Sequence, residues 1–282
     1  MSTASDETPP VDRVEQAERF RALHEGPEPL LIGNAWDAGS AKLMVSLGFR
    51  ALATTSSGFA ASLGRLDGTA MNDEALANSA VIVNAAGPVP VSADLENGFA
   101  DEPSAVRVTL LNAVSVGLAG CSIEDYTGRP DDPIYDAKFA AERVAAAVSI
   151  AHRGPVRMVL TARAENLIRG RPDLADTIAR LQAYQEAGAD VLFAPGLKDL
   201  ADIRSVVTSV DRPVNVLALP DGPPVAELAE AGVRRISVGG AFAFAAYGAL
   251  IESARELLDQ GTYGYWAKTE VGRSAVREFF GR

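Results

Sequence analysis

Two carboxylates that follow an apolar run are the first residues that could carry chemistry. Residues 89–93 have strand character, and Asp94 and Glu96 come next, just before the turn Asn97-Gly98. Because residues two apart in a strand point to the same side, the two acids should stand together at the strand's carboxyl end. Two like charges that close are costly unless a cation lies between them, and Mg²⁺ is the simplest such cation. A solvated loop with two acids is the alternative.

Other apolar runs also end in polar or small side chains. The loop that follows the second run consists of small residues, so its backbone N–H groups could hold a carboxylate or an oxyanion. Several carboxylates, an arginine and an asparagine at further run ends complete the ingredients of a pocket for Mg²⁺ and a small carboxylate. Besides Asp94 and Glu96, the candidate residues are Ser56, Ser57, Gly58, Asp67, Glu124, Arg163 and Asn215.

Each candidate also has a structural interpretation. Arg163 could be the partner of a neighbouring carboxylate, and Asn215 could satisfy backbone groups of an adjacent strand. Ser56 and Ser57 could be ordinary turn residues. Asp125 is expected to brace its loop, in preference to contacting a metal.

The cysteine and the histidines do not indicate nucleophilic catalysis. Cys121 precedes Glu124 by three residues on one predicted strand, and odd spacing puts the two side chains on opposite faces. Cys121 should therefore be inert core. His24 lies before the first strand and His152 ends the fourth helix, so neither is placed to act as a general base.

Eight strand-plus-helix units position these residues. We expect strands over residues 30–34, 51–55, 89–93, 120–125, 156–162, 191–194, 214–219 and 235–238, with helices over 38–47, 73–86, 103–116, 137–151, 174–187, 200–209, 224–231 and 241–258. This count predicts an α/β fold of the (β/α)₈ TIM-barrel type, with active residues at the strands' carboxyl ends. A doubly wound open sheet is the alternative, but no Gly-rich dinucleotide fingerprint follows the first strand.

The units suggest three regions. We expect residues 1–29 to form a tail and a leading helix, 30–258 the catalytic barrel, and 259–282 an appended helical segment. The first ten residues are polar and contain proline, so we expect a disordered tail and no signal peptide. The appended segment carries five aromatic residues, which should pack on the barrel or on a neighbouring subunit.

Composition narrows the class of partner. The chain has 282 residues, 48% of them hydrophobic and 22% charged, which is ordinary for a globular enzyme. Its formal charge of −11 argues against nucleic acid or an anionic membrane as a partner, because both repel an acidic surface. A single cysteine fits a reducing cytoplasm, where we expect the protein to work.

A set of short motifs follows one order along the chain: Asn34-Ala35-Trp36-Asp37-Ala38 with Ser40-Ala41, Thr55-Ser56-Ser57-Gly58, Asp67-Gly68, Ala93-Asp94-Leu95-Glu96-Asn97-Gly98-Phe99, Glu124-Asp125, Thr161-Ala162-Arg163 and Pro213-Val214-Asn215. Taken together, the motifs are specific, and with them the chain resembles the isocitrate lyase and phosphoenolpyruvate (PEP) mutase superfamily over nearly all of residues 30–258.

The resemblance implies a homo-oligomer, usually a tetramer in which a C-terminal helix is exchanged, and an active site with Mg²⁺. Acids matching Asp67, Asp94, Glu96 and Glu124 would hold the ion, some of them through water. The substrate's carboxylate would lie on the Ser56-Ser57-Gly58 backbone near Asp94, and Arg163 and Asn215 would bind other oxygens. Trp36 and Asp37 would line the pocket. Arg163, Asp67 and Glu124 are the residues expected to be catalytic.

The chain also departs from the resemblance. Lyases of the superfamily carry a Lys-Lys/Arg-Cys-Gly-His gate after the fourth strand, whereas residues 126–136 contain no lysine, cysteine or histidine. The lysine and the Asn-Ser pair of the mutases are missing as well. On the sixth strand, Phe193-Ala194-Pro195-Gly196 replaces the usual Phe-Pro-Glu.

These observations predict a Mg²⁺-dependent lyase that cleaves or forms a C–C bond next to an α-oxo or 2-hydroxy carboxylate, through an enolate that the ion stabilises. Residues 126–136 are expected to be a lid, and the proton donor stays open among Tyr126, Arg129, Tyr135 and a metal-bound water. The alternatives are an oxaloacetate-type decarboxylase, a phosphonomutase-like P–C enzyme, and a protein that binds α-oxo acids without turnover.

Overall fold

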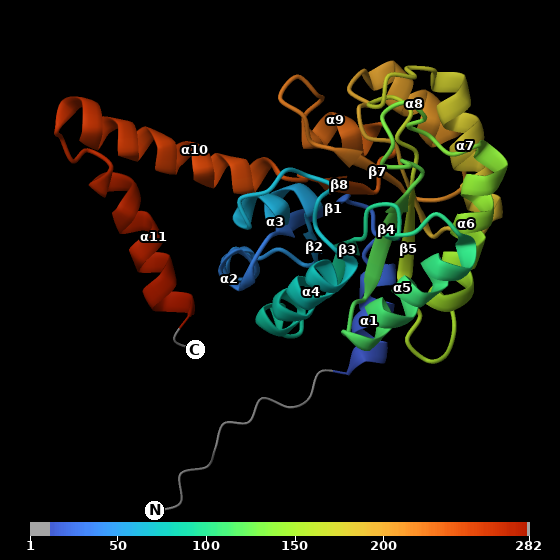
Figure 1. Ribbon diagram of the computed structural model, residues 1–282, viewed down its shortest axis with the longest axis horizontal. Coiled ribbons are helices and arrows are strands. Elements are labelled where there is room, and N and C mark those ends of the chain that lie inside the picture. Colours follow the sequence, from blue (N-terminus) through green and yellow to red (C-terminus); the bar gives the residue numbers. More distant parts are fainter. Residues whose placement is uncertain (1–11, 281–282) are drawn as a thin grey trace, which may run out of the picture.

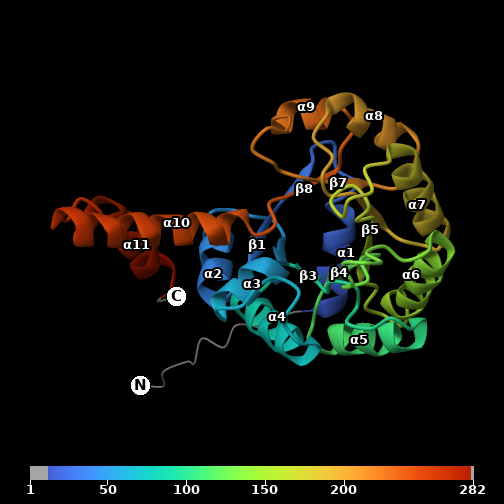
Figure 2. The ribbon, with the colours of Figure 1, turned by 45° about the horizontal axis from the view of Figure 1, so that its top comes forward.

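The computed structural model describes residues 12–280, so the tail expected over the first ten residues lies outside the described part. Eight parallel strands close into a barrel in chain order, and β8 pairs with β1 (Figures 1 and 2). The predicted TIM barrel is therefore confirmed. The strands are β1 Leu30–Ala35, β2 Leu52–Thr54, β3 Val91–Asp94, β4 Gly120–Glu124, β5 Val159–Arg163, β6 Val191–Phe193, β7 Val214–Leu217 and β8 Arg235–Ser237.

Helices form a ring around the strands, as βαβ crossovers require. Aspartates begin several of them, because a carboxylate there accepts hydrogen bonds from first-turn N–H groups; the N-caps are Asp37, Asp136, Asp173 and Asp199. The helices are α1 Arg13–Ala22, α2 Ala38–Ser46, α3 Ser56–Ser62, α4 Asn72–Ala86, α5 Pro103–Ser115, α6 Ala137–Ala151, α7 Leu174–Glu186, α8 Leu200–Thr208, α9 Val225–Glu230, α10 Ala241–Arg255 and α11 Trp266–Phe279, with the π-helix η1 Glu256–Gln260 after α10.

One element differs in kind from the sequence prediction. The small residues after β2 were expected to form a loop, but they begin with the short helix α3. Thr55 caps this helix by accepting a hydrogen bond from the Gly58 N–H at 3.3 Å. The helix directs its first turn, with Ser56 and Ser57, at the carboxyl ends of the strands.

The core has two parts. A large apolar cluster fills the space between the strands and the surrounding helices, and Cys121 belongs to it, as its spacing predicted. A smaller cluster lies inside the amino-terminal end of the barrel, where Phe20 and Leu23 pack on Leu30, Ile32 and other inward-facing side chains. Helix α1 lies across that end (Figure 2), so the interior is closed there and opens at the carboxyl ends.

The last helices project from the barrel as an arm. Figure 1 shows α10 running outward and α11 turning back toward the barrel. At the end of α11, the centre of the Phe280 ring lies 5.6 Å from Lys42 Nζ on α2. The arm exposes large apolar side chains, including Leu258 with 82% of its surface accessible. Within residues 12–280, no helix has the length and apolar character needed to cross a bilayer.

Candidate active site

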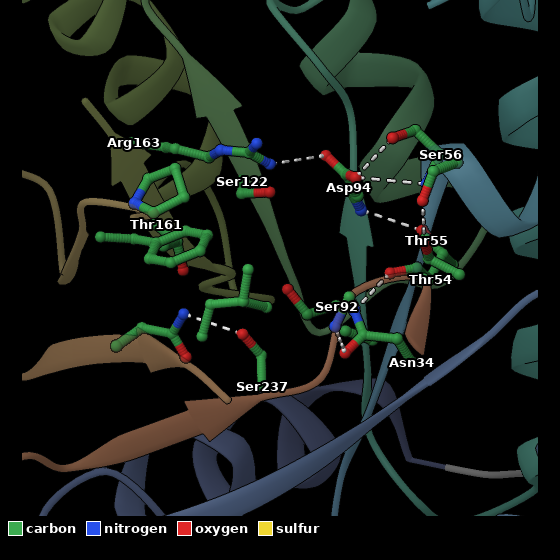
Figure 3. A pocket seen from close by; sticks show the side chains of 18 of the residues that line it. Asn34, Thr54, Thr55, Ser56, Ser92, Asp94, Ser122, Thr161, Arg163 and Ser237 are labelled. Carbon is green, nitrogen blue, oxygen red and sulfur yellow. Dashed lines mark hydrogen bonds and ion pairs between the residues drawn. The ribbon is translucent and has the colours of Figure 1, made fainter. Parts of the chain in front are cut away.

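A cavity of about 250 Å³ opens at the carboxyl ends of the strands (Figure 3), and residues from all eight strands line it. A second cavity of about 380 Å³ adjoins it and shares Ser56, Asp67 and Arg163. The first cavity contains Asp94 and the second contains Glu96 and Glu124. The candidate acids and the arginine thus come from distant parts of the sequence to one opening, which we call the mouth.

Arg163, at the end of β5, is the centre of the charges at the mouth. Its Nη1 lies 3.3 Å from Glu124 Oε2 and 4.0 Å from Asp94 Oδ1, and Figure 3 shows it pointing toward Asp94. Its Nε donates a hydrogen bond to the buried Glu165. Burial opposes the charged form, but Glu124, Glu165 and Asp94 together raise the pKa of Arg163 above its ordinary value. The guanidinium is therefore a fixed positive charge.

A second arginine joins this network. Arg169 Nε donates to Glu165 Oε2 at 3.0 Å, and its Nη2 lies 4.0 Å from Glu124 Oε1. The guanidinium carbon also stands 3.7 Å from the centre of the Tyr126 ring, a cation–π contact. Two buried acids are thus balanced by two arginines, which offsets the cost of removing their charges from water.

Hydrogen bonds to Thr54 and Ser56 fix both the backbone and the side chain of Asp94. Its backbone N–H donates to Thr54 Oγ1 at 2.9 Å, and its Oδ2 accepts from the Ser56 N–H at 3.2 Å and the Ser56 hydroxyl at 2.8 Å (Figure 3). The first turn of α3 is therefore tied to the end of β3. The other carboxylate oxygen, Oδ1, faces Arg163.

Glu96 reaches the mouth by a different route from the one expected. Strand β3 ends at Asp94, and Glu96 has φ of 48°, so the two acids do not alternate along one strand. They nevertheless interact, because burial, Asp94 and Asp67 together raise the pKa of Glu96 to about 7. Negative charge is in excess on this side of the mouth.

This side fits a magnesium ion in its donor chemistry. Asp67, Asp94, Glu96 and Glu124 offer only carboxylate oxygens, and burial together with the neighbouring charges of Asp94 and Asp67 raises the pKa of Glu96 despite Arg163 and Arg169. Within residues 12–280, however, no three acids, histidines or cysteines are grouped closely enough to hold a metal by themselves. Mg²⁺ commonly uses one or two carboxylates and keeps several waters, so this spacing is compatible with the expected ion.

Two buried groups beneath the mouth brace its loops. Asp125 accepts hydrogen bonds from the Glu165 N–H at 2.8 Å, from Arg180 Nη1 at 3.2 Å and from the Tyr184 hydroxyl at 2.5 Å. This is the bracing role that its sequence position suggested. Arg143 of α6 donates to four backbone carbonyls, which belong to Asn97, Ala100, Asp101 and Glu124.

The loop after β4 is an ordered hairpin. Tyr126 pairs with Ile134 in an antiparallel bridge, and Arg129 Nη1 lies 3.0 Å from Asp101 Oδ2. Tyr135 donates to the same aspartate, and burial with that bond raises the pKa of Tyr135 to about 12. Among the three side chains proposed as proton donors, Tyr126 lines the second cavity, whereas Arg129 and Tyr135 are held by Asp101.

The remaining predicted site residues divide into two groups. Ser57 and Asn215 line the first cavity, and the amide nitrogen of Asn215 donates to Ser237 Oγ at 3.0 Å. Trp36 and Gly58 are not among the lining residues. Trp36 packs against the apolar core, and the Gly58 N–H is used to start α3. Asp37, expected beside Trp36, caps α2.

Sequence reasoning missed three charged residues at or below the mouth. Glu165 and Arg169 follow Arg163 at spacings of two and six, and the first of these repeats the i, i+2 pattern of Asp94 and Glu96. Arg235 lies inside the barrel on β8 and lines the first cavity. Its alternation with Ser237, beside Asn215 on β7, is the pattern that could have identified it.

Comparison with known proteins shows the family of the chain. Residues 20–258 match the family model described as phosphoenolpyruvate phosphomutase. A putative lyase/mutase of Burkholderia cenocepacia J2315 is similar in structure, with a TM-score of 0.90 and 48% identity over 95% of this chain and 96% of that one. A 2,3-dimethylmalate lyase, a member of the PEP mutase/isocitrate lyase superfamily, has a TM-score of 0.81 and 30% identity over 91% and 90% of the two chains.

A curated relative with a different reaction is also similar. An oxaloacetate decarboxylase of Bradyrhizobium diazoefficiens is 28% identical over 72% of this chain and 71% of its own length. The relatives thus include proteins named as lyases and as decarboxylases. From the family match and the shared fold, the chain belongs to the PEP mutase/isocitrate lyase superfamily.

Proposed function

We propose that the protein is a magnesium-dependent lyase that cleaves or forms a C–C bond next to the oxo or hydroxyl carbon of a small carboxylic acid. The observation that carries this proposal is the position of Arg163 at the mouth, 3.3 Å from Glu124 and 4.0 Å from Asp94, while the further acids Asp67 and Glu96 line the same opening. One side of the mouth suits a cation and the other suits an anion, and a chelating oxo acid needs both.

The residues divide the work of binding between them. Asp67, Asp94, Glu96 and Glu124 would hold Mg²⁺ directly or through water, and the ion would withdraw electron density from the substrate's oxygens. Arg163 supplies fixed positive charge where negative charge develops as the C–C bond breaks. Ser56, Ser57 and Asn215 border the same cavity and would orient the carboxylate.

Tyr126 is the proton donor that the geometry favours. It lines the second cavity, beside Glu96, Glu124 and Arg163, and its ring is held against the Arg169 guanidinium. Its hydroxyl would deliver a proton to the carbon from which the leaving fragment departs. The variant Tyr126→Phe, which removes only the oxygen, is expected to lower kcat while leaving KM nearly unchanged.

The test is a panel of 2-hydroxy acids and their α-oxo counterparts, each mixed with the purified protein and Mg²⁺. We expect release of glyoxylate, pyruvate or another short oxo acid from at least one candidate, and loss of that release in Asp94→Asn and on chelation of the metal. If the Asp94→Asn variant and the wild type gave the same products at the same rate, the proposal would be wrong.

Decarboxylation of an oxaloacetate-like acid is the second candidate. It requires the same charges but no acid beside a second organic product, and neither histidine nor the cysteine lines the two cavities at the mouth. The similarity to an oxaloacetate decarboxylase supports it. Release of CO₂ from oxaloacetate, without a second carbonyl product, would distinguish it from C–C cleavage of a hydroxy acid.

The arm supports a homo-oligomer as the working state. Helix α11 has no buried side chain, although Trp266, Val271 and Val276 are apolar. A second copy of the chain is the natural cover for such a surface, since a dimer or tetramer repeats it by symmetry. Light scattering should give a dimer or tetramer for the wild type and a smaller species for Val271→Glu with Val276→Glu.

A further inference from the structure

Below the mouth lies a polar chamber where barrels are normally filled. The interiors of TIM barrels are packed with layers of bulky branched side chains. Here the corresponding layer contains small hydroxyl-bearing residues, among them Ser92, Ser122 and Thr161, which line the first cavity (Figure 3). The cavity therefore continues from the mouth into the barrel.

Arg235 forms part of the wall of this chamber and has no acidic partner there. Only 5% of its surface is accessible, and its Nη1 donates to Thr161 Oγ1 across the barrel at 3.0 Å. Its Nε is buried without a hydrogen-bond partner among residues 12–280, and no salt bridge to it occurs in that range. Burial lowers the pKa of Arg235 to about 10, so the side chain stays charged at neutral pH.

A second group in the chamber is also unsatisfied. Asn215, which pairs with Arg235 in the β7–β8 register, is buried, and its Oδ1 has no partner within the described residues. If the amide turns by 180°, Ser237 can donate to its oxygen. Arg235 and the nearby hydroxyls are then the donors that the chamber offers.

A buried arginine without a counter-charge is unfavourable, and an arginine does not relieve the cost by losing its proton. The chamber opens only toward the mouth, because α1 and the small apolar cluster close the other end. Any counter-ion must therefore enter by the route that the substrate takes. Thr161 precedes Arg163 by two residues on β5, which places the chamber roughly 7 Å below Arg163 along the strand.

We infer that the chamber binds an anionic group, held by Arg235, and that this group is the second charge of a dianionic oxo acid whose first carboxylate lies at the mouth beside Ser56 and Ser57. The inference rests on the proposed function, since it assigns the substrate class of the same cavity. A free inorganic anion is the other source of the same chemistry, and the experiment separates the two.

The experiment measures binding and requires no turnover. Succinate and butyrate have the same carbon chain but differ by one carboxylate, and their affinities for the wild type are measured by calorimetry at constant Mg²⁺. We expect succinate to bind at least tenfold more tightly, since hydrogen bonds to a charged group are strong. In Arg235→Met the preference should fall to within about threefold, with butyrate affinity unchanged.

Arg234→Met is the matched control. Arg234 precedes Arg235 on the chain, lies on the other face of the barrel wall, and donates to the Pro27 carbonyl at 3.0 Å. It should retain the wild-type preference for succinate. Equal preference for succinate in the wild type and in Arg235→Met would overturn the inference, even if lyase activity were found. If instead the activity panel failed but the preference for succinate depended on Arg235, only the proposed reaction would be overturned.

The inorganic source is tested by chloride. If chloride raises the melting temperature of the wild type but not of Arg235→Met, and succinate shows no preference over butyrate, the anion site is supported and the substrate class is not. Should Arg235→Met fail to fold, wild-type crystals soaked in bromide give the answer. Anomalous scattering beside Arg235 supports the site, and its absence in a soaked crystal overturns it.

Discussion

The mouth and the chamber differ in how the charges of their buried arginines are balanced. At the mouth, Arg163 and Arg169 are surrounded by Glu124, Glu165 and Asp94, and each guanidinium has at least one carboxylate within 4.0 Å. One layer lower, Arg235 has a threonine hydroxyl as its hydrogen-bond partner. Paired charges can be maintained by the protein alone, whereas the lone charge requires something from solution. This difference distinguishes Arg163 and Arg169, whose charges the protein itself balances, from Arg235, whose charge a bound ligand would balance.

The largest effect is expected from Arg163→Lys. Lysine keeps the charge but cannot contact Glu124, Glu165 and Asp94 with a planar fork, so the charge is misplaced relative to the substrate. We expect kcat/KM to fall about 10³-fold once a substrate is known. Arg171→Lys, in an exposed pair with Asp132, should behave as wild type. A fall of less than tenfold would mean that Arg163 is structural.

Asp125→Ala tests the paired charges through stability. It leaves Arg180 and Tyr184 without their buried partner, so the free energy of unfolding should fall by about 3–5 kcal/mol in a urea titration. Asp132→Ala, which removes an exposed carboxylate, should cost less than about 1 kcal/mol. Similar losses in both variants would contradict the claim that burial distinguishes these pairs.

A third prediction concerns pH and the base of the barrel. Burial, helped by nearby Arg235 and opposed by Asp190, lowers the pKa of His24 to about 4, from 6.5 in the unfolded chain. Between these values the unfolded chain binds a proton that the folded protein does not. The contribution of His24 to the free energy of unfolding is therefore fully present above pH 6.5, and it falls by about 3 kcal/mol as the pH drops toward 4.

The measurement is the unfolding free energy of the wild type minus that of His24→Gln at several pH values. This difference removes the contribution of other acids that titrate in the same range. It should shrink steadily from pH 7 to pH 4.5. A constant difference would show that His24 has the same pKa in the folded and unfolded protein, which would contradict the prediction.

The smallest effect is expected from Arg129→Ala in the hairpin. Its pair with Asp101 is about half exposed, so global stability should change by less than about 1 kcal/mol. Amide exchange in residues 127–135 should nevertheless become faster, because the hairpin loses one of its contacts with the loop after β3. Unchanged exchange would indicate that Tyr135 alone fixes the hairpin.

The sequence predicted the barrel well because its signals are local and repeated. Apolar runs alternate with helical periods, and residues 137–151 were assigned to a helix whose bounds the structure reproduces in α6. The helix α3 was missed because serines and Gly58 weaken helix propensity, while Thr55 caps it and Asp94 ties its first turn to β3. Such tertiary support is invisible in a single stretch of sequence.

For the site, residue types at strand ends were informative and fine positions were not. Asp94, Glu124 and Arg163 could be grouped because parallel strands end at one edge. The orientation of Trp36 toward the core, and the left-handed backbone at Glu96, depend on packing that no spacing encodes. Arg235 was overlooked because an arginine beginning a short apolar run resembles an outward-facing residue.

Arg143 has a consequence for how this barrel can change its chemistry. Its single guanidinium clasps carbonyls from the loop after β3 and from the end of β4, while its own helix begins where the hairpin ends. The hairpin thus begins and ends beside segments that Arg143 holds in place. Substitutions within the hairpin can therefore bring a new proton donor to the mouth without moving the acids beside it.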